Sequence, residues 1–475
     1  MTDQLIEYDG LGLADLIRTG QVSSAELVEV VIGRIERLNP TLNFMTNKGY
    51  DLARSAAADP PRQGAFAGLP WLLKDLILGH AGVPLTSGSR FFRDHVPAQD
   101  SVMIHRLKSL GLIYIGSTNV PEFGINLQSG NALFGDTRNP WDTSRTPGGS
   151  SGGAACAVAA RVMPFAHGGD GGGSIRVPSS YCGLVGLKPS RGRNTYFPDY
   201  ADVWYGCGTD GCLSISVRDT AAYSDAMWGS TPGDPYEIQP LSRPLLEEVG
   251  ADPGKLRIGL MTRSPGPISS EDAARTAEAA ARLCESLGHH VEVTEIPIDY
   301  TRFTATFIRV INVLTAMGLD TAEALMNRKA GADDLQPVVW AIRDLAKNVS
   351  GVEHALDVEV LRQMGRDICM AVSKYDIVIT PSTPVTAPEV GDPSQAWSDV
   401  DAYFERLVGF MAFSAPISIS GLPAISLPIE TASNGMPLGT QLIANRGRED
   451  LLIRLASQIE AAKPWKDRLP PVSAR

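Results

Sequence analysis

Residues 145–193 read RTPGGSSGGAACAVAARVMPFAHGGDGGGSIRVPSSYCGLVGLKPSRGR, and this stretch decides the fold. It holds two glycine-rich turns, one around Ser150 and one before Ser174, joined by small residues at 154–160 that can pack as a tight helix. Dense glycine is entropically unfavourable, so it marks places that need unusual dihedral angles or close backbone approach. In the second turn, the N–H groups of residues 171–174 can form a concave nest for an anion.

The composition limits the classes of partner. The chain has 475 residues and a formal net charge of −11, which argues against a phosphate backbone or an anionic membrane surface as its main partner. None of the six cysteines forms a C-x-x-C pair, so we expect reduced, mostly buried thiols. The first residues lack a secretory pattern and no apolar run approaches the length of a membrane helix, so we expect a cytoplasmic protein.

Strand and helix patterns alternate along the chain, which predicts an α/β fold. The clearest examples are a helix and strand at 102–110 and 112–116, and a strand, helix and strand at 256–260, 270–287 and 291–293. Residues 8–43 read as helices that stop at Asn39-Pro40, residues 208–230 as the beginning of another helix, and residues 301–375 as mostly helical.

Lys74 is an anomaly in an apolar stretch. Residues 66–79 predict a buried strand in which Trp71, Leu72 and Leu73 precede the lysine. Lysine is almost never fully buried without a partner. Lys74 is therefore either a solvated strand end or a desolvated amine that can act as a base.

Several familiar sites fit poorly. Residues 149–153 satisfy the G-x-S-x-G pattern with Ser151 as nucleophile, but that elbow needs a late histidine base, and the last 120 residues contain no histidine. His167 lies beside the glycine nest, and we expect it to be packed and hydrogen-bonded to the backbone. No P-loop lysine follows either glycine cluster, and no zinc motif is present, so we expect no metal and no cofactor.

What remains is a set of groups for acyl transfer without histidine: a lysine, two serines and a donor nest. The motifs GGSSGG at 148–153, DGGGSIR at 170–176 and GLKP at 186–189, with Lys74 upstream, resemble the amidase signature family of serine hydrolases. GLPAISLP at 421–428 and GMPLGTQLI at 435–443 also resemble that family, so the resemblance covers about residues 10–465.

The resemblance implies a role for each motif residue. Ser174 is expected to be the nucleophile, Ser150 the relay serine after a cis peptide bond, and Lys74 the base. The oxyanion hole is expected to consist of the N–H groups of Gly171, Gly172, Gly173 and Ser174. Asp170 and Arg176 are expected to brace the nest, and Ser151 to orient the site. Many members have Ile or Thr where this chain has Gly171.

The resemblance also implies the architecture. It predicts one amidase domain over residues 1–475, with a central twisted mixed β-sheet flanked by helices on both faces. Residues 65–195 are expected to form the catalytic core, about 235–375 a peripheral, mostly helical region, and 376–465 a return to the core.

The substrate expectation is narrower. AHGGDGGGS at 166–174, CGLVGLKPSRGR at 182–193 and GREDLL at 447–452 most resemble the bacterial aminohexanoate cyclic-dimer (nylon oligomer) hydrolases and relatives that cleave aryl amides and urethanes. We expect a linear or cyclic amide or a carbamate with an apolar or aryl group. The expected pocket residues are Gly124, Ile125, Asn126 and Leu127, with further candidates at 307–314, 413–420 and 441–443.

Three other functions stay open: a glutaminase subunit of an amidotransferase complex, an esterase that uses Ser151, and a non-catalytic binding scaffold. An intact set of Lys74, Ser150 and Ser174 argues against the scaffold. The expected partner is a small-molecule substrate, with no nucleic acid and no membrane, and a homodimer is left open.

Overall fold

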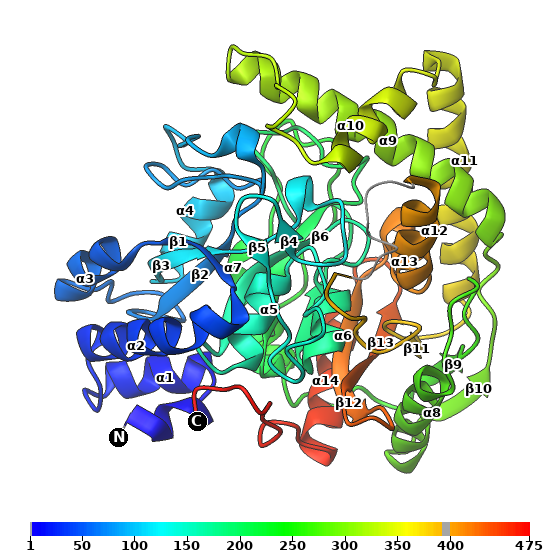
Figure 1. The fold of residues 1–475 in the computed structure, drawn as a ribbon. Helices are drawn as coiled ribbons and strands as arrows, with labels where there is room; N and C mark the ends of the chain where they lie inside the picture. Colours follow the sequence, from blue (N-terminus) through cyan, green and yellow to red (C-terminus); the bar gives the residue numbers. More distant parts are fainter. Residues whose placement is uncertain (1, 392–399) are drawn as a thin grey trace.

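The computed structural model describes residues 2–391 and 400–475 (Figure 1). The α-helices are α1 (Gly10–Arg18), α2 (Ser24–Leu42), α3 (Tyr50–Ala58), α4 (Val102–Ser109), α5 (Gly152–Ala159), α6 (Arg176–Cys182), α7 (Val217–Met227), α8 (Glu271–Ser286), α9 (Tyr300–Leu325), α10 (Pro337–Ala346), α11 (Gly351–Val372), α12 (Val400–Phe410), α13 (Ala415–Ser420) and α14 (Glu449–Ala462). The 3-10 helices are η1 (Thr2–Glu7), η2 (Arg90–Phe92), η3 (Glu122–Gly124) and η4 (Leu245–Glu248).

The strands form three sheets. They are β1 (Met45–Lys48), β2 (Pro70–Lys74), β3 (Ile113–Thr118), β4 (Gly130–Asn131), β5 (Gly135–Asp136), β6 (Phe165–Asp170), β7 (Val185–Lys188), β8 (Thr209–Ser214), β9 (Arg257–Leu260), β10 (His290–Val293), β11 (Ile377–Pro381), β12 (Ala424–Thr431) and β13 (Pro437–Ala444). In the described residues, the main sheet has eight strands in the order β10-β9-β11-β13-β12-β7-β8-β6. Its β10, β9 and β11 are parallel and its other pairs antiparallel, which confirms a mixed α/β sheet.

Helices cover both faces of this sheet, as the alternation along each strand requires. Ile377 and Ile379 of β11 belong to a core that includes residues of α7, α8 and α14. Val378, between them, belongs to the opposite core, which includes residues of α6, α9, α11 and α13. The prediction of a sheet flanked on both faces is therefore confirmed (Figure 1).

Lys74 ends a strand of a smaller sheet rather than of the main one. Here β2 pairs in parallel with β3, and β3 pairs antiparallel with β1. β2 packs beside β6, the edge strand of the main sheet. The backbone N–H of Lys74 donates to the His167 side chain on β6 across this boundary, at 3.3 Å. β2 and β6 are not paired by backbone hydrogen bonds, and the His167 side chain accepts the Lys74 N–H in place of a backbone carbonyl.

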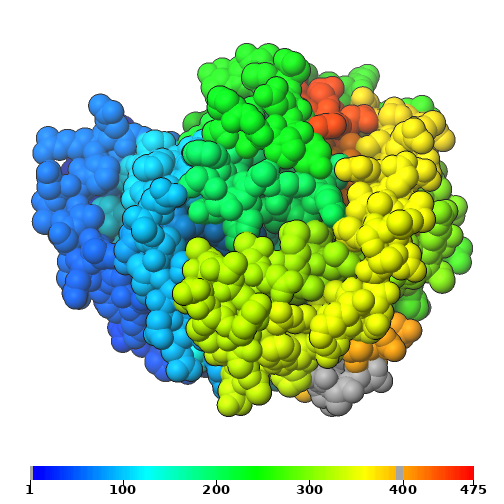
Figure 2. All heavy atoms as spheres, turned by 90° about the horizontal axis from the view of Figure 1, so that it is seen from above, coloured from blue at the N-terminus to red at the C-terminus, as the bar shows by residue number. Residues whose placement is uncertain are grey.

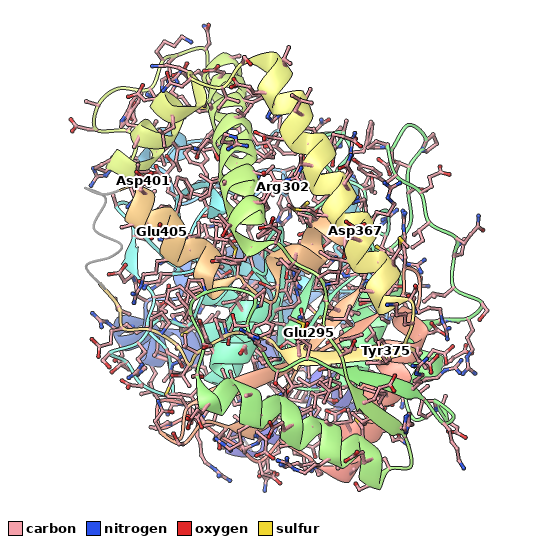
Figure 3. All side chains as sticks on the ribbon, turned by 90° about the vertical axis from the view of Figure 1, so that its right-hand side faces the viewer. Glu295, Arg302, Asp367, Tyr375, Asp401 and Glu405 are labelled. Atoms are coloured by element: carbon pink, nitrogen blue, oxygen red, sulfur yellow. The ribbon has the colours of Figure 1, made fainter. Side chains whose placement is uncertain are left out.

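The region at 301–375 is helical, as predicted, and consists mainly of α9, α10 and α11. Figure 3 shows it from the side, with Arg302 on α9, Asp367 on α11, and Asp401 and Glu405 on α12. From above, the surface is hollowed where the cyan, green and yellow-green segments meet (Figure 2). Among the described residues, α9 is the one helix that is long and apolar enough to cross a membrane. Half of its most apolar 18-residue segment is buried inside the protein, so this is weak evidence for a membrane-spanning helix.

Two local predictions were wrong. The helix predicted to stop at Asn39-Pro40 continues to Leu42, because Pro40 lies in the last turn, where one missing donor is tolerated; Asn43 then ends it in a left-handed conformation. Residues 208–230 do not begin as a helix: Thr209–Ser214 forms β8, held between β6 and β7, and α7 starts only after the Ser216 cap.

Helix α5 is the small-residue helix expected between the two turns, and all of its residues are buried. Gly153 faces the backbone of Asn119, so that a Cβ on Gly153 would lie 2.5 Å from the Asn119 nitrogen and 2.6 Å from its oxygen. The glycine allows α5 to pack against the segment that follows β3. This contact holds the start of α5, and with it the Ser150 turn, close to the Lys74 sheet.

We therefore predict that Gly153→Ala lowers the free energy of unfolding by about 1–3 kcal/mol, because the backbone of Asn119 must shift. Urea unfolding measures this change. Gly33→Ala is the matched control: Gly33 lies within α2 with nothing within 4 Å of an added Cβ. It should raise stability by about 0.5–1 kcal/mol. Unchanged stability in Gly153→Ala would contradict the packing described here.

Candidate active site

The Lys74 side chain is buried and has two neutral hydrogen-bond partners. Lys74 lies at the end of β2, where only 2% of it is exposed. Its Nζ lies 2.8 Å from Ser150 Oγ and donates to the Gly169 carbonyl at 3.0 Å. Lys74 makes no ion pair with a carboxylate in residues 2–391 and 400–475 within the 4.0 Å distance of a salt bridge. Of the two alternatives that the sequence left open, a solvated strand end and a desolvated amine, the burial of Lys74 agrees with the second.

This environment favours the neutral amine. Burial lowers the pKa of Lys74 to about 8, while the negative charges of Asp210 and Asp170 act in the opposite direction. Desolvation disfavours a charged amine because the interior cannot replace its hydration. At neutral pH Lys74 is still mostly protonated, but its neutral fraction is far larger than that of an ordinary lysine, and this fraction can accept a proton from Ser150.

Ser150 is placed by the turn that precedes α5. The Gly149–Ser150 peptide bond is cis, as the family resemblance implied. Ser151 follows; its N–H donates to the Ser174 carbonyl at 3.3 Å and its Oγ donates to the Gly169 carbonyl at 3.2 Å. Ser151 therefore ties the first turn to the second and to the carbonyl that also receives Lys74.

Ser174 and the donor nest lie between β6 and α6. In the described part of the chain, the N–H groups of residues 171–174 donate to no protein acceptor, and Gly171, Gly172 and Ser174 line a pocket. The Ser174 hydroxyl likewise makes no hydrogen bond to a described group, so the bond from Ser150 to Ser174 is not present in this geometry. The nest thus has free donors on the wall of a cavity.

Neighbouring side chains enclose the three glycines of the nest. A Cβ on Gly171 would lie 3.2 Å from a ring carbon of Trp204. On Gly172 it would lie 2.9 Å from Met411 Sδ, and on Gly173 2.3 Å from Ser414 Oγ. The glycine at 171, where many family members carry a larger residue, is therefore matched to the Trp204 ring.

Asp170 and Arg176 form the brace that was expected beside the nest. Both side chains are fully buried, and Arg176 donates from Nε and Nη2 to the two Asp170 oxygens at 2.9 Å each. Asp170 also accepts the backbone N–H groups of Ile175 and Arg176. Arg176 reaches Gln441 on β13 and Ser418 on α13, so the pair links the turn to the C-terminal core.

His167 is packed and satisfied, as expected. Its Nδ1 accepts the Lys74 N–H at 3.3 Å and its Nε2 lies 3.0 Å from Asp210 Oδ1. The imidazole is therefore engaged on both nitrogens and does not bond Ser151. The Ser151 esterase lacks a base in this geometry.

One pocket of about 70 Å³ collects these groups. Its polar wall includes Lys74, Ser150, Gly169, Asp170, Gly171, Gly172, Ser174, Tyr196, Gly208, Thr209 and Asp210, and its apolar wall includes Leu76, Ile77, Phe123, Gly124, Val203 and Trp204.

Of the predicted pocket residues, only Gly124 lines this cavity. Ile125 and Leu127 belong to a buried core, and the Ile125 carbonyl accepts the Tyr403 hydroxyl at 2.7 Å. The Asn126 carbonyl lies beneath Gly149, 2.9 Å from where its Cβ would be. The backbone of Asn126 and Leu127 therefore lies against the Ser150 turn, whereas Ile125 contributes to the core.

Sequence reasoning missed the pocket wall formed by the loop between β7 and β8. Tyr196, Val203 and Trp204 come from this loop, and Asp210 follows at the start of β8. Trp204 and Tyr205 both have positive φ, of 53° and 52°. A cluster of aromatic residues among Pro, Gly and Asp, directly after the GLKP motif, was the available signal.

A second cavity lies behind Trp204, which lines both. It contains Phe307, Val310, Ile311 and Leu314 of α9, as well as Ile419 of α13. Part of the wider pocket prediction, at 307–314 and 413–420, thus falls on a neighbouring apolar cavity. Gln441 instead lies buried in β13, bonded to Arg176.

Known proteins with similar sequences and structures are amidases. The amidase family model matches residues 26–453. The 6-aminohexanoate-cyclic-dimer hydrolase of Pseudomonas sp. (strain NK87) is 35% identical, over 97% of this chain and 96% of the relative. The solved structure of a 6-aminohexanoate cyclic dimer hydrolase complexed with substrate has a TM-score of 0.94 at 33% identity, over 98% and 99% of the two chains. A bacterial aryl acylamidase has a TM-score of 0.88 at 26% identity, over 96% of each chain.

We predict that Arg176→Met lowers the free energy of unfolding by about 3–5 kcal/mol, because it leaves the buried Asp170 carboxylate uncompensated. Urea titration followed by tryptophan fluorescence measures the change. Arg18→Met is the control: its ion pair with Asp15 is exposed, so little change is expected. Equal stability of Arg176→Met and the unmodified protein would show that the brace is not a stabilising element.

Proposed function

Because this chain belongs to the amidase family and is a hydrolase of amide C–N bonds, we propose that it works through Ser174, Ser150 and Lys74 and a seryl acyl-enzyme. The observation that carries this proposal is the meeting of three features in one pocket. These are a buried lysine bonded to Ser150, an unbonded Ser174 hydroxyl, and free backbone donors beside it.

The first half of the reaction follows from these positions. Neutral Lys74 takes the proton of Ser150, and Ser150 takes the proton of Ser174 as its Oγ attacks the carbonyl carbon. The negative charge that develops on the carbonyl oxygen is stabilised by the N–H groups of residues 171–174. The lysine ammonium then returns its proton through Ser150 to the leaving nitrogen, the C–N bond breaks, and the amine departs.

The second half uses the same groups. Water attacks the Ser174 ester and gives its proton to Ser150 and Lys74. The tetrahedral intermediate collapses, the C–O bond to Ser174 breaks, and the proton returns to the serine through Ser150. The carboxylic acid leaves, and the starting protonation state is restored. A carbamate has the same C–N bond beside a carbonyl carbon, so it can follow the same path.

The pocket wall supports an apolar or aryl substrate. Ile77, Phe123, Val203 and Trp204 offer an apolar wall in the same pocket as the donor nest, and the Trp204 ring lies next to Gly171. Aromatic rings pack favourably against an indole in offset or edge-on geometry. The proposed substrates are therefore linear or cyclic amides and carbamates with apolar or aryl groups; among the relatives, one is named for a cyclic dimer of 6-aminohexanoate and one for aryl acylamides.

The three catalytic positions give a direct prediction. Ser174→Ala, Ser150→Ala and Lys74→Met should each reduce amine release from an acyl anilide by at least about a thousandfold, because members of one proton-transfer unit fail together. Peptide mass mapping should place the trapped acyl group on Ser174. An acyl group on Ser151 would instead favour an esterase that uses Ser151 as its nucleophile. Cleavage of glutamine alone would favour a glutaminase subunit of an amidotransferase complex.

Trp204 gives a separate prediction about specificity. Trp204→Ala should raise KM for an aryl anilide about tenfold, since an aromatic contact is worth roughly 0.5–1.5 kcal/mol beyond its buried area. Trp204→Phe should retain most of the affinity. A short aliphatic amide, assayed in parallel, should change far less. A uniform loss for both substrates would mean that Trp204 supports the loop and does not select the substrate.

A further inference from the structure

A chain of two hydrogen bonds runs from the backbone of the lysine to a second buried carboxylate. The Lys74 N–H can only donate, so His167 Nδ1 must be the acceptor of their 3.3 Å contact. The imidazole proton therefore lies on Nε2, which donates to Asp210 Oδ1 at 3.0 Å. His167, a residue of β6, is therefore neutral and connects Lys74 of β2 to Asp210 of β8.

Asp210 is unusual among the buried carboxylates. It is 4% exposed and lines the catalytic pocket. Its Oδ1 accepts from His167, whereas its buried Oδ2 accepts no well-directed hydrogen bond from a described residue; the Tyr196 hydroxyl is the side-chain donor that interacts with this carboxylate. A buried carboxylate oxygen without a donor is costly, so its presence at the pocket needs an explanation.

The charges around Lys74 come from several elements. Asp170 and His167 lie on β6, Asp210 on β8, Lys188 on β7, Arg176 on α6, and Tyr196 in the loop between β7 and β8. Burial lowers the pKa of Lys188 to about 7, and burial together with Asp210 raises that of Tyr196.

Of the two carboxylates that favour a charged Lys74, only Asp210 lacks a paired arginine. Asp170 is held by both arms of the Arg176 guanidinium. The ion-pair contact of Asp210 is with His167, which the hydrogen-bond geometry makes neutral. The charge of Asp210 is thus the one left to balance a proton that arrives on Lys74.

We propose that Asp210 and His167 are positioning residues for Lys74: His167 fixes the end of β2, and Asp210 balances the ammonium that forms while Ser174 is acylated. This inference rests on the proposed function, because it takes Lys74 as the proton acceptor. An Oδ2 without a well-directed hydrogen bond is then explained, because its negative charge balances the protonated lysine.

The sign of the effect is definite. Replacing Asp210 with asparagine keeps the shape and an acceptor for His167 but removes the negative charge. The charged form of Lys74 loses its counter-charge, so its pKa must fall. The amine then stays neutral at lower pH, while the ammonium intermediate is less well stabilised. The acid limb of kcat/KM should move to lower pH, and kcat at the optimum should fall.

A direct titration of Lys74 tests this without requiring turnover. Protein labelled with ¹³C at lysine Cε is titrated by NMR, and the Lys74 signal is assigned with Lys74→Arg. Asp210→Asn should lower the Lys74 midpoint by about one pH unit. Asp225→Asn is the charge-matched control: Asp225 lies on α7 and accepts the N–H groups of Leu245 and Leu246, so the midpoint should not move.

An unchanged midpoint in Asp210→Asn, or an equal shift in Asp225→Asn, overturns the inference. If Asp210→Asn does not fold, Asp210→Ser removes the same charge in a smaller side chain. His167→Gln, which offers both an acceptor and a donor, should retain most of kcat, and His167→Leu should lose it with little change in KM. Equal losses would reduce His167 to a packing role. A shifted midpoint in a protein that releases no amine would instead refute the proposed function and leave the coupling standing.

Discussion

The site depends on keeping a lysine amine in the protein interior without a carboxylate beside it. Lys74 has a serine hydroxyl and a carbonyl as its partners, and its nearest negative charges act from outside hydrogen-bond range. A lysine in direct contact with a carboxylate would remain charged and could not accept a proton near neutral pH. The separation of β2 from the main sheet, the His167 bridge and the Ser150 turn all serve to hold the amine in this position.

The glycine-rich turns meet a second constraint, which is access to the backbone. Free N–H groups are useful at residues 171–174 only if nothing in the protein accepts them and the chain around them is held in place. Trp204, Met411 and Ser414 occupy the space where side chains on the three glycines would lie. The buried Asp170–Arg176 pair anchors the end of the same turn. The glycine segment at 171–173 is therefore enclosed by side chains from other parts of the chain.

Much of this arrangement could be predicted because its signals are local. The apolar strand at Lys74, the small-residue helix α5 and the strand–helix–strand pattern of β9, α8 and β10 follow from short-range periodicity. The β6 and β8 strands could not be recognised in this way, because Gly, Asp and Ser have low strand propensity and only pairing in the sheet makes them strands. Trp204 and Asp210 line the pocket but are distant in sequence from Lys74 and Ser150. Short-range patterns therefore gave no sign that they belong to the site. Ile125 and Leu127 were expected in the pocket from their position after the strand near Asn119, but their apolar side chains belong to the core. The catalytic roles of Lys74, Ser150 and Ser174 stay predictions.

The central claim is that a neutral Lys74 starts the reaction at Ser174. The most direct test is the rate of acyl-enzyme formation in a single turnover, followed by quenched flow and intact mass from pH 6 to about 10. The account predicts a rate that rises about tenfold per pH unit and levels off above the lysine midpoint, near pH 8, with all acyl mass on Ser174. An acylation rate that does not change over this range, or an acyl group on another residue, would contradict it.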